Sequence, residues 1–493
     1  MTRRTMTMIG GGSGVLLVLL GGAAWWVFRG AAPAFLPPPA NIAAIIRRTP
    51  TNATGMPLTL PPGFSIGIFA SELGKPRVLH MGPRGELLVS VPEDGHVLAL
   101  RDRDGDGAAE ERAVVVTGLR KPHGIVTWEQ DGRWKLFVAA EDRVLAFDYD
   151  PDARRAANPT TLTELPVGGQ HVTRSLSLQW NPRVDTPPRL LVSVGSSCNI
   201  CQETDARRAA ILSMNLDGSD VRPFATGLRN SVFMAHAPWT RGGPVWATEM
   251  GQDFLGDALP PDEINLVEEG RDYGWPYCYG KNVRNAFDAR RSVACDTKTP
   301  SHIDLPAHVA PLGLAFIPEI GWPKGWGNDL LVAYHGSWNR SSPTGYEIVR
   351  VRLAEYGARV VGIEDFISGW RVSDQRALGR PVDLLAQPNG TLYISDDHAG
   401  VIYRVTYDPS VWVDDGQEGK PPDRSAGGCV ITGCSGQVCA DREVMTTCEY
   451  RPEYACYANE RCERQENGSC GWVATEALRS CLDRTRRPSF PGT

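Results

Sequence analysis

A net positive charge and a haem-attachment motif are both absent from the sequence. The 57 aspartate and glutamate residues outnumber the 51 lysine and arginine residues, which gives a formal net charge of -6 at pH 7. Without a basic face, nucleic acid is not an expected partner. Cys198-Asn-Ile-Cys201 is followed by Gln202, where a haem-attachment motif has histidine. We therefore expect a structural disulfide at this pair, with a redox role as the alternative.

Glycine, proline and cysteine are, by contrast, plentiful. The 493 residues include 52 glycines and 38 prolines, which is typical of a globular protein rich in strands and turns. The length predicts one large domain and a smaller one. The 12 cysteines are an even number, which indicates disulfides formed in an oxidising compartment.

The N-terminus carries an apolar run flanked by positive charge. Arg3 and Arg4 precede an uncharged stretch from Ile9 to Phe28, and Arg29 follows it. This length spans a bilayer, and positive charge in front of it favours an N-inside orientation. We predict a transmembrane anchor in residues 1–30, with a removed signal peptide as the alternative. The rest of the chain would then face the periplasm or extracytoplasmic space, after a Pro-rich linker at 31–59.

A repeated pattern occupies residues 60–410. Each unit has an apolar strand, a Pro/Gly turn and a second apolar strand, and most units continue into a third strand. The six units begin at Lys75, Lys121, His171, Leu228, Ala310 and Gly379. Their spacing predicts an all-β fold, a six-bladed β-propeller, because closing the ring removes exposed sheet edges. A pair of β-sandwiches is the alternative, but it predicts no common motif at the unit starts.

The unit starts are mostly polar, and a propeller would bring them together at one end of its central channel. They carry Arg77, His123, His171, Arg174, Arg229, Asn230 and Arg380. Imidazole and guanidinium groups at equivalent places predict a pocket for an anionic or polyhydroxyl ligand. Hydrated polar groups with no ligand are the alternative.

Four motifs, in this order and spacing, resemble the soluble pyrroloquinoline-quinone-dependent glucose and sorbosone dehydrogenases. They are GLRN at 227–230, EMGQ…DEINLVEEGRDYGWP from Glu249, HGSWNRSSPTGYEIVRV from His335, and GRPVD…PNGTLYISDDHAGVIYRV from Gly379. The resemblance runs from about Leu60 to Tyr407. It implies a six-bladed propeller that binds pyrroloquinoline quinone (PQQ) and Ca²⁺ at the channel mouth.

The resemblance also assigns roles. His171 lies where the family has its general base, which suits imidazole because its pKa is near working pH. Arg229 matches a cation beside the quinone oxygens, and Asn230 matches a neighbouring quinone contact. Arg380 matches a clamp on the cofactor carboxylates, for which a forked guanidinium is the suitable donor.

The same resemblance implies calcium ligands. Gly251 and Gln252 match positions that offer main-chain carbonyl oxygens near the cofactor. Glu263 and Tyr273 match a structural site farther out. Hard oxygen ligands are those that Ca²⁺ prefers.

Two positions depart from the glucose enzymes of this family. Val382 stands where they carry a second arginine, and Ser196 stands near the place of an acid that follows the base. The chain therefore resembles the sorbosone-dehydrogenase branch more closely. We expect His335 at the same mouth, as a cofactor contact. Arg340 is the nearest cation to His335 that could replace a quinone-contacting lysine. Trp338 offers a stacking face for a sugar or quinone, with core filling between blades as the alternative.

Asp102, Asp104 and Asp106 lie in Asp-Arg-Asp-Gly-Asp-Gly, which resembles the first half of a calcium loop. Ala113 stands at the twelfth position, where an EF-hand has glutamate, so the loop is not a complete EF-hand. A calcium-pinned turn and a plain solvated hairpin are both open interpretations.

Eight cysteines fall between Cys429 and Cys481, after a polar linker at 411–428. The module at 429–482 contains no histidine and no C-x-x-C pair, so we expect four disulfides rather than zinc. A module this small needs such cross-links to fold. It resembles the bacterial eight-cysteine-cluster domain in GCSGQVCA, TTCEYRPEYACY and CGW, which implies a binding or spacer role. Residues 483–493 form a tail.

Two functional hypotheses follow. The first is a membrane-tethered dehydrogenase that oxidises an aldose or similar polyol with bound PQQ and Ca²⁺. It would pass electrons to an external acceptor, the quinone pool or a cytochrome. The second is a non-redox propeller that binds carbohydrate or protein. A metal-dependent lactonase fits less well, because it would line the channel with acidic and amide side chains.

Overall fold

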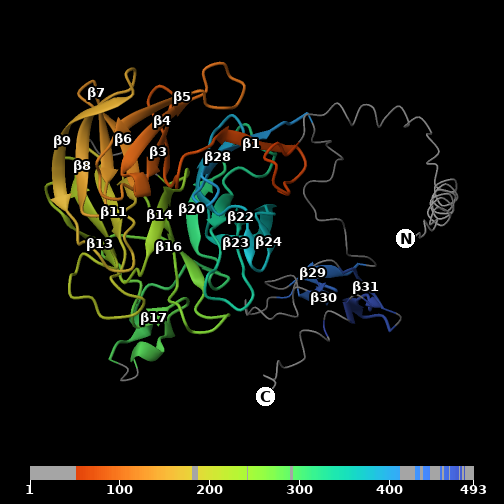
Figure 1. Cartoon of the computed structure of the whole chain (residues 1–493). Helices are drawn as coiled ribbons and strands as arrows, with labels where there is room; N and C mark the ends of the chain where they lie inside the picture. The colour runs from red at the N-terminus through yellow and green to blue at the C-terminus, as the bar shows by residue number, and fades with distance from the viewer. Residues whose placement is uncertain are drawn as a thin grey trace, which may run out of the picture. The chain divides into compact units, whose positions relative to one another are not determined.

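The computed structural model describes residues 51–410, apart from 180–186, 241 and 289–291, and parts of the segment from 428 to 482 (Figure 1). The predicted anchor at residues 1–30 and most of the linker at 31–59 lie outside the described residues. None of the described segments forms a helix with the length and apolar character that a bilayer span requires.

Six four-stranded antiparallel sheets make up the propeller, and we number them as blades in chain order. Blade 1 is β2 (Leu79–Met81), β3 (Leu87–Val91), β4 (His96–Arg101) and β5 (Glu111–Val116). Blade 2 is β6 (Gly124–Gln130), β7 (Arg133–Ala139), β8 (Arg143–Asp150) and β9 (Arg155–Glu164). Blade 3 is β10 (Leu176–Gln179), β11 (Arg189–Val194), β12 (Ala210–Asn215) and β13 (Arg222–Thr226).

Blade 4 is β14 (Ser231–His236), β15 (Val245–Glu249), β16 (Asp262–Val267) and β19 (Ile303–Leu305). Blade 5 is β20 (Pro311–Phe316), β21 (Leu330–Tyr334), β22 (Glu347–Ala354) and β23 (Arg359–Ile367). Blade 6 is β26 (Pro381–Ala386), β27 (Thr391–Asp396), β28 (Val401–Tyr407) and β1 (Phe64–Ala70). Three short 3₁₀ turns lie at Pro92–Asp94, Ala286–Asp288 and Cys295–Thr297.

The innermost strand of each blade contacts the innermost strand of the next. β2 lies beside β6, β6 beside β10, β10 beside β14, β14 beside β20, β20 beside β26, and β26 beside β2 again. The ring is therefore closed, which confirms the predicted six-bladed propeller and excludes the pair of sandwiches. Each predicted unit start directly precedes one of these inner strands.

The middle strands are apolar on both faces because blades cover them on both sides. All five residues of β3 are buried, whereas the outermost strand β5 keeps exposed positions. In β21, Leu330 and Val332 pack into one buried cluster, and Leu331 and Ala333 pack into another. Successive side chains of a strand point to opposite faces, so one strand fills two spaces between blades.

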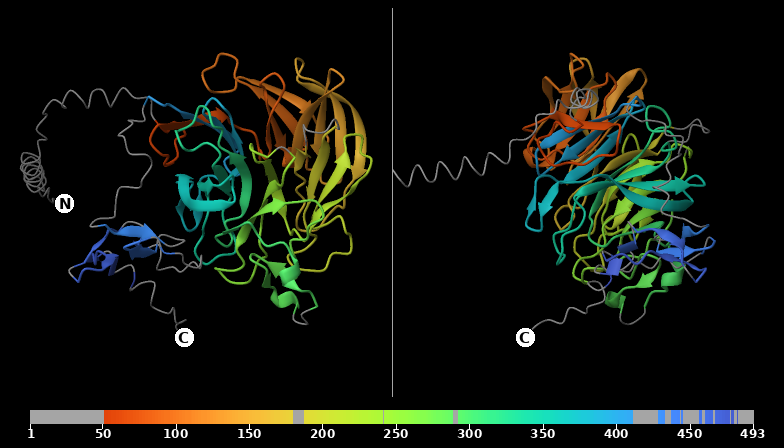
Figure 2. Two further views of the ribbon diagram at one scale, coloured as in Figure 1. Left: turned by 180° about the vertical axis from the view of Figure 1, so that it is seen from behind. Right: turned by 90° about the vertical axis from the view of Figure 1, so that its right-hand side faces the viewer.

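The first strand of the propeller completes the last blade. β1 pairs with β28 in antiparallel register, from Phe64 opposite Tyr407 to Ile68 opposite Tyr403. The two strands lie side by side in Figures 1 and 2, with β1 in red and β28 in blue. The Phe64 ring contacts the rings of Trp326 and Phe366 at centroid distances of 5.4 and 5.0 Å. This pairing joins the two ends of the propeller chain.

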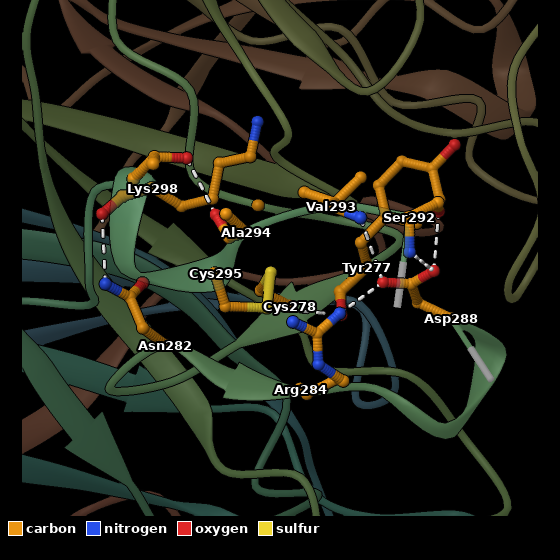
Figure 3. Close-up of a disulfide and its surroundings, with 12 residues drawn as sticks. Tyr277, Cys278, Asn282, Arg284, Asp288, Ser292, Val293, Ala294, Cys295 and Lys298 are labelled. Carbon is orange, nitrogen blue, oxygen red and sulfur yellow. Dashed lines mark hydrogen bonds and ion pairs between the residues drawn. A yellow bond between two sulfur atoms is a disulfide. The ribbon is translucent and has the colours of Figure 1, made fainter. Parts of the chain in front are cut away.

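An insertion separates β16 from β19 in blade 4. It contains the hairpin β17 (Cys278–Tyr279) and β18 (Val283–Arg284) and a disulfide between Cys278 and Cys295. Figure 3 shows this disulfide beside an ion pair between Arg284 and Asp288. A second hairpin, β24 (Arg371–Ser373) and β25 (Arg376–Ala377), precedes blade 6.

The C-terminal cysteine-rich segment contains two further hairpins. They are β29 (Val430–Thr432) with β30 (Val438–Ala440), and β31 (Cys462–Arg464) with β32 (Cys470–Trp472). Disulfides join Cys429 to Cys470 and Cys439 to Cys462. Cys456 is also disulfide-bonded. The region is disulfide-rich as predicted, and Cys434, Cys448 and Cys481 lie outside the described residues.

Truncation of Phe64 tests whether closure by β1 sustains the propeller. Phe64 is 1% exposed, so Phe64→Ala leaves a cavity between blades, and we expect a loss of about 3–5 kcal/mol in the free energy of unfolding. Val114→Ala, at a 54% exposed position of β5, is the matched control and should stay within about 0.5 kcal/mol of the parent. Urea denaturation followed by tryptophan fluorescence measures both. Equal midpoints for the two variants would contradict the assigned role of β1.

Candidate active site at the channel mouth

The polar unit starts meet at one end of the channel, which we call the site mouth. It consists of the segments before the inner strands and the loops between the second and third strands of each blade. Hydrogen bonds cross between blades here. Arg77 of blade 1 pairs with Asp397 of blade 6 at 2.6 Å, and Asp397 accepts from His335 of blade 5 at 2.9 Å. Polar side chains from different blades therefore converge at one end of the channel, as predicted.

His171 is held through one ring nitrogen. Its Nδ1 lies 3.0 Å from the main-chain oxygen and 2.9 Å from the Oγ of Ser196. The Ser196 hydroxyl donates its proton to the carbonyl oxygen of Cys198 at 2.7 Å, so it accepts from His171. Nδ1 must then carry the ring proton, and Nε2 keeps a lone pair. His171 thus has the tautomer that a general base needs.

The surroundings of His171 favour the neutral imidazole. Burial lowers its pKa to about 3, and the positive charge of Arg229 acts in the same direction. The hydrogen bond to the Ser196 carbonyl opposes this shift, and Arg174 and Arg208 add to it. The ring is therefore uncharged at neutral pH.

Gly195 allows His171 to approach Asn230. A Cβ atom on Gly195 would lie 2.5 Å from the His171 Cβ and 2.8 Å from the Asn230 Oδ1. Both distances are shorter than a side chain tolerates. Glycine is required here for close approach, and the site packs around its missing side chain.

Arg229 is 4% exposed and is surrounded by acceptors. Its Nε donates to the Asn199 carbonyl at 2.9 Å, and its Nη1 donates to the Met250 carbonyl at 3.2 Å. Its Nη2 donates to the Asn199 Oδ1 at 2.8 Å and to the Asp253 carboxylate at 3.1 Å. These bonds use four of the five guanidinium protons. Burial lowers the pKa of Arg229, and Asp253 and Glu249 oppose this.

Asn230 is buried beside Arg229. Its main-chain N–H donates to Glu249 at 2.6 Å, and its Nδ2 donates to the Met250 sulfur at 3.5 Å. Burial raises the pKa of Glu249 to about 8, although its hydrogen bonds to Ser231 and Asn230 favour the charged form. Asn230 therefore presents an amide at the mouth from a fixed position.

Arg380 and His335 are joined. The Arg380 Nε donates to the His335 carbonyl oxygen at 3.0 Å. Burial lowers the pKa of His335 to about 4, so its neutral Nε2–H donates to Asp397. Burial opposes ionisation of Asp397, but the hydrogen bond from His335 and the Arg77 guanidinium outweigh it and hold its pKa below the usual range.

A cavity of about 230 Å³ opens beside this network. Three cations line it, namely Lys75, Arg77 and Lys121, together with His123, Glu93 and Asp397. His123 is 1% exposed, and its Nε2 has no partner among the described residues. The cavity can therefore take an anionic group. Another cavity, of about 850 Å³, lies along the inner strands and includes His80 and His236 but none of the predicted site residues.

Val382 does not face this mouth. It is fully buried in the cluster of apolar side chains between blades. The second arginine expected by analogy is therefore absent from blade 6, while Arg77 provides a cation from blade 1.

Trp338 is 69% exposed and lies edge to face with Phe254, which is 73% exposed, at a centroid distance of 5.6 Å. Trp338 is thus not core filling. The loops that carry these rings are tied by Asn339, which donates to Asp253 at 2.8 Å. Arg340 donates to the Ala307 carbonyl at 3.1 Å, and its role as a quinone contact stays a prediction.

The candidate calcium ligands near the cofactor position have suitable oxygens. No hydrogen bond among the described residues uses the main-chain carbonyl oxygens of Gly251 or Gln252. The Gly251 N–H donates to Asp262, and the Gln252 side-chain oxygen accepts from Asn285. Burial raises the pKa of Asp262 to about 7.

Glu263 and Tyr273 have different hydrogen-bond partners. Glu263 accepts from Asn265 at 3.0 Å and from the Gly280 N–H at 2.6 Å. The Tyr273 hydroxyl donates to the Leu266 carbonyl. A shared calcium site for these two residues stays a prediction.

The acidic loop between β4 and β5 gathers four carboxylates. Asp102, Asp104, Asp106 and Glu110 each place an oxygen within 4.8 Å of the others. Asp102 also accepts from the Gly105 and Gly107 N–H groups. Glu110 is a fourth carboxylate that the sequence pattern did not indicate, because it lies at the ninth position of the loop and not at the twelfth, where an EF-hand has glutamate.

Sequence reasoning also missed Asp397, Asn199 and Asp253. Asp397 directly follows the buried strand β27, within the family-like motif that begins at Gly379. A polar residue at the end of a buried strand was the signal that could have indicated it. Asn199 and Asp253 gave no comparable signal, because their roles depend on contacts with Arg229 across 30 and 24 positions.

The ionisation of His171 can be tested in the cofactor-free protein. Because its pKa is lowered to about 3, we expect a neutral ring with Nδ1 protonated from pH 8 down to about pH 4. Nitrogen NMR of ¹⁵N-histidine-labelled protein, assigned with His171→Gln, reads the tautomer directly. A His171 ring that becomes an imidazolium near pH 6.5 would refute this description.

A second prediction concerns Gly195. We expect Gly195→Ala to displace His171 and Asn230 and to change the His171 NMR signals, because the new methyl group has no room. Gly85→Ala is the control for a surface turn, since nothing lies within 4 Å of a Cβ there, although its φ of 79° adds local strain. Unchanged His171 signals in Gly195→Ala would show that the packing is looser than described.

Comparison with known proteins agrees with this architecture. The chain is 25% identical over 406 residues to the PQQ-dependent pyranose dehydrogenase of Coprinopsis cinerea, covering 69% of this chain and 53% of that enzyme. The chain thus spans about half the length of that relative. The holo PQQ domain of the C. cinerea pyranose dehydrogenase has a TM-score of 0.59 at 24% identity, over 72% of this chain and 98% of that one.

The calcium structure of the Trichoderma reesei carbohydrate-active enzyme of family AA12 has a TM-score of 0.60 at 22% identity, over 72% of this chain and 100% of that chain. Both structures share the propeller fold with this protein. The family model described as TrAA12-like matches residues 58–408, well over half of the sequence. The chain therefore belongs to the TrAA12-like family.

Proposed function

We propose that the protein is a quinone-dependent dehydrogenase that oxidises a CH–OH group of a sugar, with PQQ and Ca²⁺ bound at the site mouth. The observation that carries this proposal is His171, a neutral imidazole with a free Nε2 lone pair beside the buried Arg229. The name of the C. cinerea relative, a PQQ-dependent pyranose dehydrogenase, supports the reaction class.

The residues at the mouth fit a quinone that carries carboxylates. Arg77, Lys75 and Lys121 line an anion-sized cavity, and Arg380 donates to the carbonyl oxygen of His335, whose ring bonds Asp397 at that cavity. The buried, unpartnered Nε2 of His123 adds a polar group to the same cavity. The charge that Val382 fails to supply is thus available from blades 1 and 2. When bound, PQQ supplies a two-electron acceptor for hydride.

His171 would act as the general base. Its Nε2 accepts the proton of the sugar hydroxyl while the neighbouring C–H is oxidised. Its Nδ1–H stays bonded to Ser196, which stabilises the imidazolium that forms. Arg229 opposes a positive charge on His171, so negative charge bound beside Arg229 would restore the basicity of the ring.

Arg229 and Asn230 would orient the cofactor. Four hydrogen bonds fix the guanidinium, so its charge stays in place during the reaction without reorganisation. The free carbonyl oxygens of Gly251 and Gln252 would hold Ca²⁺ close by, as oxygen donors suited to that ion. The calcium structure of the T. reesei family AA12 enzyme, which shares the propeller fold, supports this assignment.

The substrate would be a pyranose or similar polyol that enters at the mouth. Trp338 and Phe254 offer an exposed aromatic edge there, against which the apolar face of a sugar ring can pack. Electrons would leave to an external acceptor, the quinone pool or a cytochrome. The N-terminal segment would anchor the protein in the membrane, facing the periplasm, where its disulfides are stable.

A calorimetric titration of the full chain with PQQ in the presence of Ca²⁺ tests cofactor binding. We expect one PQQ per chain, and Ca²⁺ removal with a chelator should weaken binding. Dye-linked oxidation of a panel of pyranoses should then follow. Lack of PQQ binding by correctly disulfide-bonded protein would overturn the proposal and favour a non-redox propeller.

His171→Ala separates catalysis from binding. Because His171 acts on the sugar hydroxyl rather than on the cofactor, we expect kcat to fall by about 10²–10⁴-fold while PQQ affinity stays within a few fold of the parent. His236→Ala is the matched control, since His236 lies along the channel wall outside the mouth. Near-normal turnover in His171→Ala would remove His171 as the base.

A further inference from the structure

The loop closed by the Cys198–Cys201 disulfide touches both candidate catalytic residues. It follows β11 in blade 3 and lies at the site mouth. From these contacts we infer that the disulfide loop is a positioning element, with Asn199 as the residue that aligns Arg229 and Cys198 as the residue that aligns His171 through Ser196. This inference rests on the proposed function and names residues that the family resemblance did not assign.

Asn199 contacts Arg229 through two acceptor atoms. The Asn199 main-chain oxygen accepts from Nε at 2.9 Å, and its side-chain oxygen accepts from Nη2 at 2.8 Å. A guanidinium bonded at two edges has a fixed plane. Because one residue provides both acceptors, the conformation of Asn199 sets the orientation of Arg229.

Asn199 is itself held by two hydrogen bonds to the main chain of Asp253. Its Oδ1 also accepts from the Asp253 N–H at 2.8 Å, and its Nδ2 donates to the Asp253 carbonyl at 3.1 Å. Asp253 pairs with Arg229 at 3.1 Å and accepts from Asn339 at 2.8 Å. Asn199 thus links blade 3 to the loops of blades 4 and 5 that carry the exposed aromatic edge.

The contact with His171 runs through one hydroxyl. The Ser196 Oγ donates to the Cys198 carbonyl oxygen at 2.7 Å, and this fixes the Oγ as the acceptor for His171 Nδ1–H. The Ser196 main-chain oxygen, 3.0 Å from Nδ1, requires the same ring proton, so the Cys198 carbonyl reinforces this tautomer by fixing the hydroxyl as a second acceptor. The disulfide loop therefore helps to align the His171 ring.

The disulfide is suited to this local role. It joins residues only 3 positions apart, whereas Cys278–Cys295 spans 17 positions, and a short closed loop gains less stability from a cross-link than a long one. The cross-link restricts the backbone of Asn199 and the carbonyl of Cys198. Ser197 adds a further restraint, since its N–H and hydroxyl both donate to Glu203.

Three sets of variants in the full chain test the inference. Asn199→Ala removes one acceptor from Arg229 and keeps the disulfide, and Asn199→Asp restores a side-chain oxygen. Cys198→Ser with Cys201→Ser opens the loop. Cys278→Ser with Cys295→Ser is the matched control, because it opens a disulfide in the blade 4 insertion (Figure 3).

The first measurement uses cofactor-free protein and the His171 NMR titration. Burial lowers the pKa of His171 most, and the positive charges of Arg229, Arg174 and Arg208 lower it further. When Arg229 loses its alignment, its effect weakens, so the His171 pKa should rise in Asn199→Ala and in the opened loop. Asn199→Asp keeps the side-chain acceptor but places a negative charge beside Arg229, so it should raise the His171 pKa as well. The control should leave it unchanged. Titration curves identical to the parent in both loop variants would overturn the inference, whatever the protein catalyses.

The second measurement is kinetic and uses the PQQ-loaded protein. We expect kcat to fall by roughly 10- to 100-fold in Asn199→Ala and in the opened loop, since misplaced groups cost about this much. The KM for sugar should change little, and the acid limb of the pH profile should move towards neutral pH. Parent-like kcat and pH profile in both loop variants would contradict the positioning role. A parent protein that oxidises no sugar would refute the proposed function, while the NMR titration would still decide the inference.

Discussion

A buried guanidinium must have acceptors on every side, and this constraint organises the site mouth. Arg229 is removed from water, so losing any partner would leave a charged donor unsatisfied. Its partners come from a disulfide loop of blade 3 and from the loop between β15 and β16 of blade 4. Asp253 extends the network to Asn339 of blade 5. One arginine thereby links three loops at the site mouth.

Closure of the ring gives these loops a rigid base. The middle strands of the blades are buried on both faces, and β1 joins the first and last strands of the propeller across more than 300 positions. In a closed ring the inner edge of each blade faces the channel, so only the outermost strands offer an edge to other chains. The loops at the mouth can then carry charged and strained residues, such as Phe254 with its φ of 70°, without weakening the blades.

The sequence predicts the blades well because they are local. Each unit start, turn and inner strand falls within about 25 residues, and periodicity of apolar residues reports them directly. The pairing of β1 with β28 is not local, and nothing in the Phe64 segment indicates its partner. Asp397 was likewise not predicted as the bridge between Arg77 and His335, because 320 positions of sequence separate it from Arg77.

Val382 shows the limit of reasoning by position. When the sequence is aligned with the family motif, Val382 indicates that an arginine of the site has been lost. In the structure its side chain fills the apolar space between blades, and a cation reaches the mouth from Arg77 in another blade. Ser196 is a second example. It stands near the position where the glucose enzymes of the family have an acidic residue, yet its hydroxyl still orients the His171 ring. The charge and geometry of the site mouth depend on side chains from several blades. The residue type at a single aligned position does not report them.

The central claim is that a sugar reduces a quinone held at this mouth. The most direct measurement mixes the PQQ- and Ca²⁺-loaded full chain with a pyranose under anaerobic conditions, without any external acceptor, and follows the absorbance of the cofactor. We expect reduction of one PQQ per chain in a single turnover. A protein that binds PQQ stoichiometrically but leaves it oxidised with every aldose and polyol tested would contradict the account.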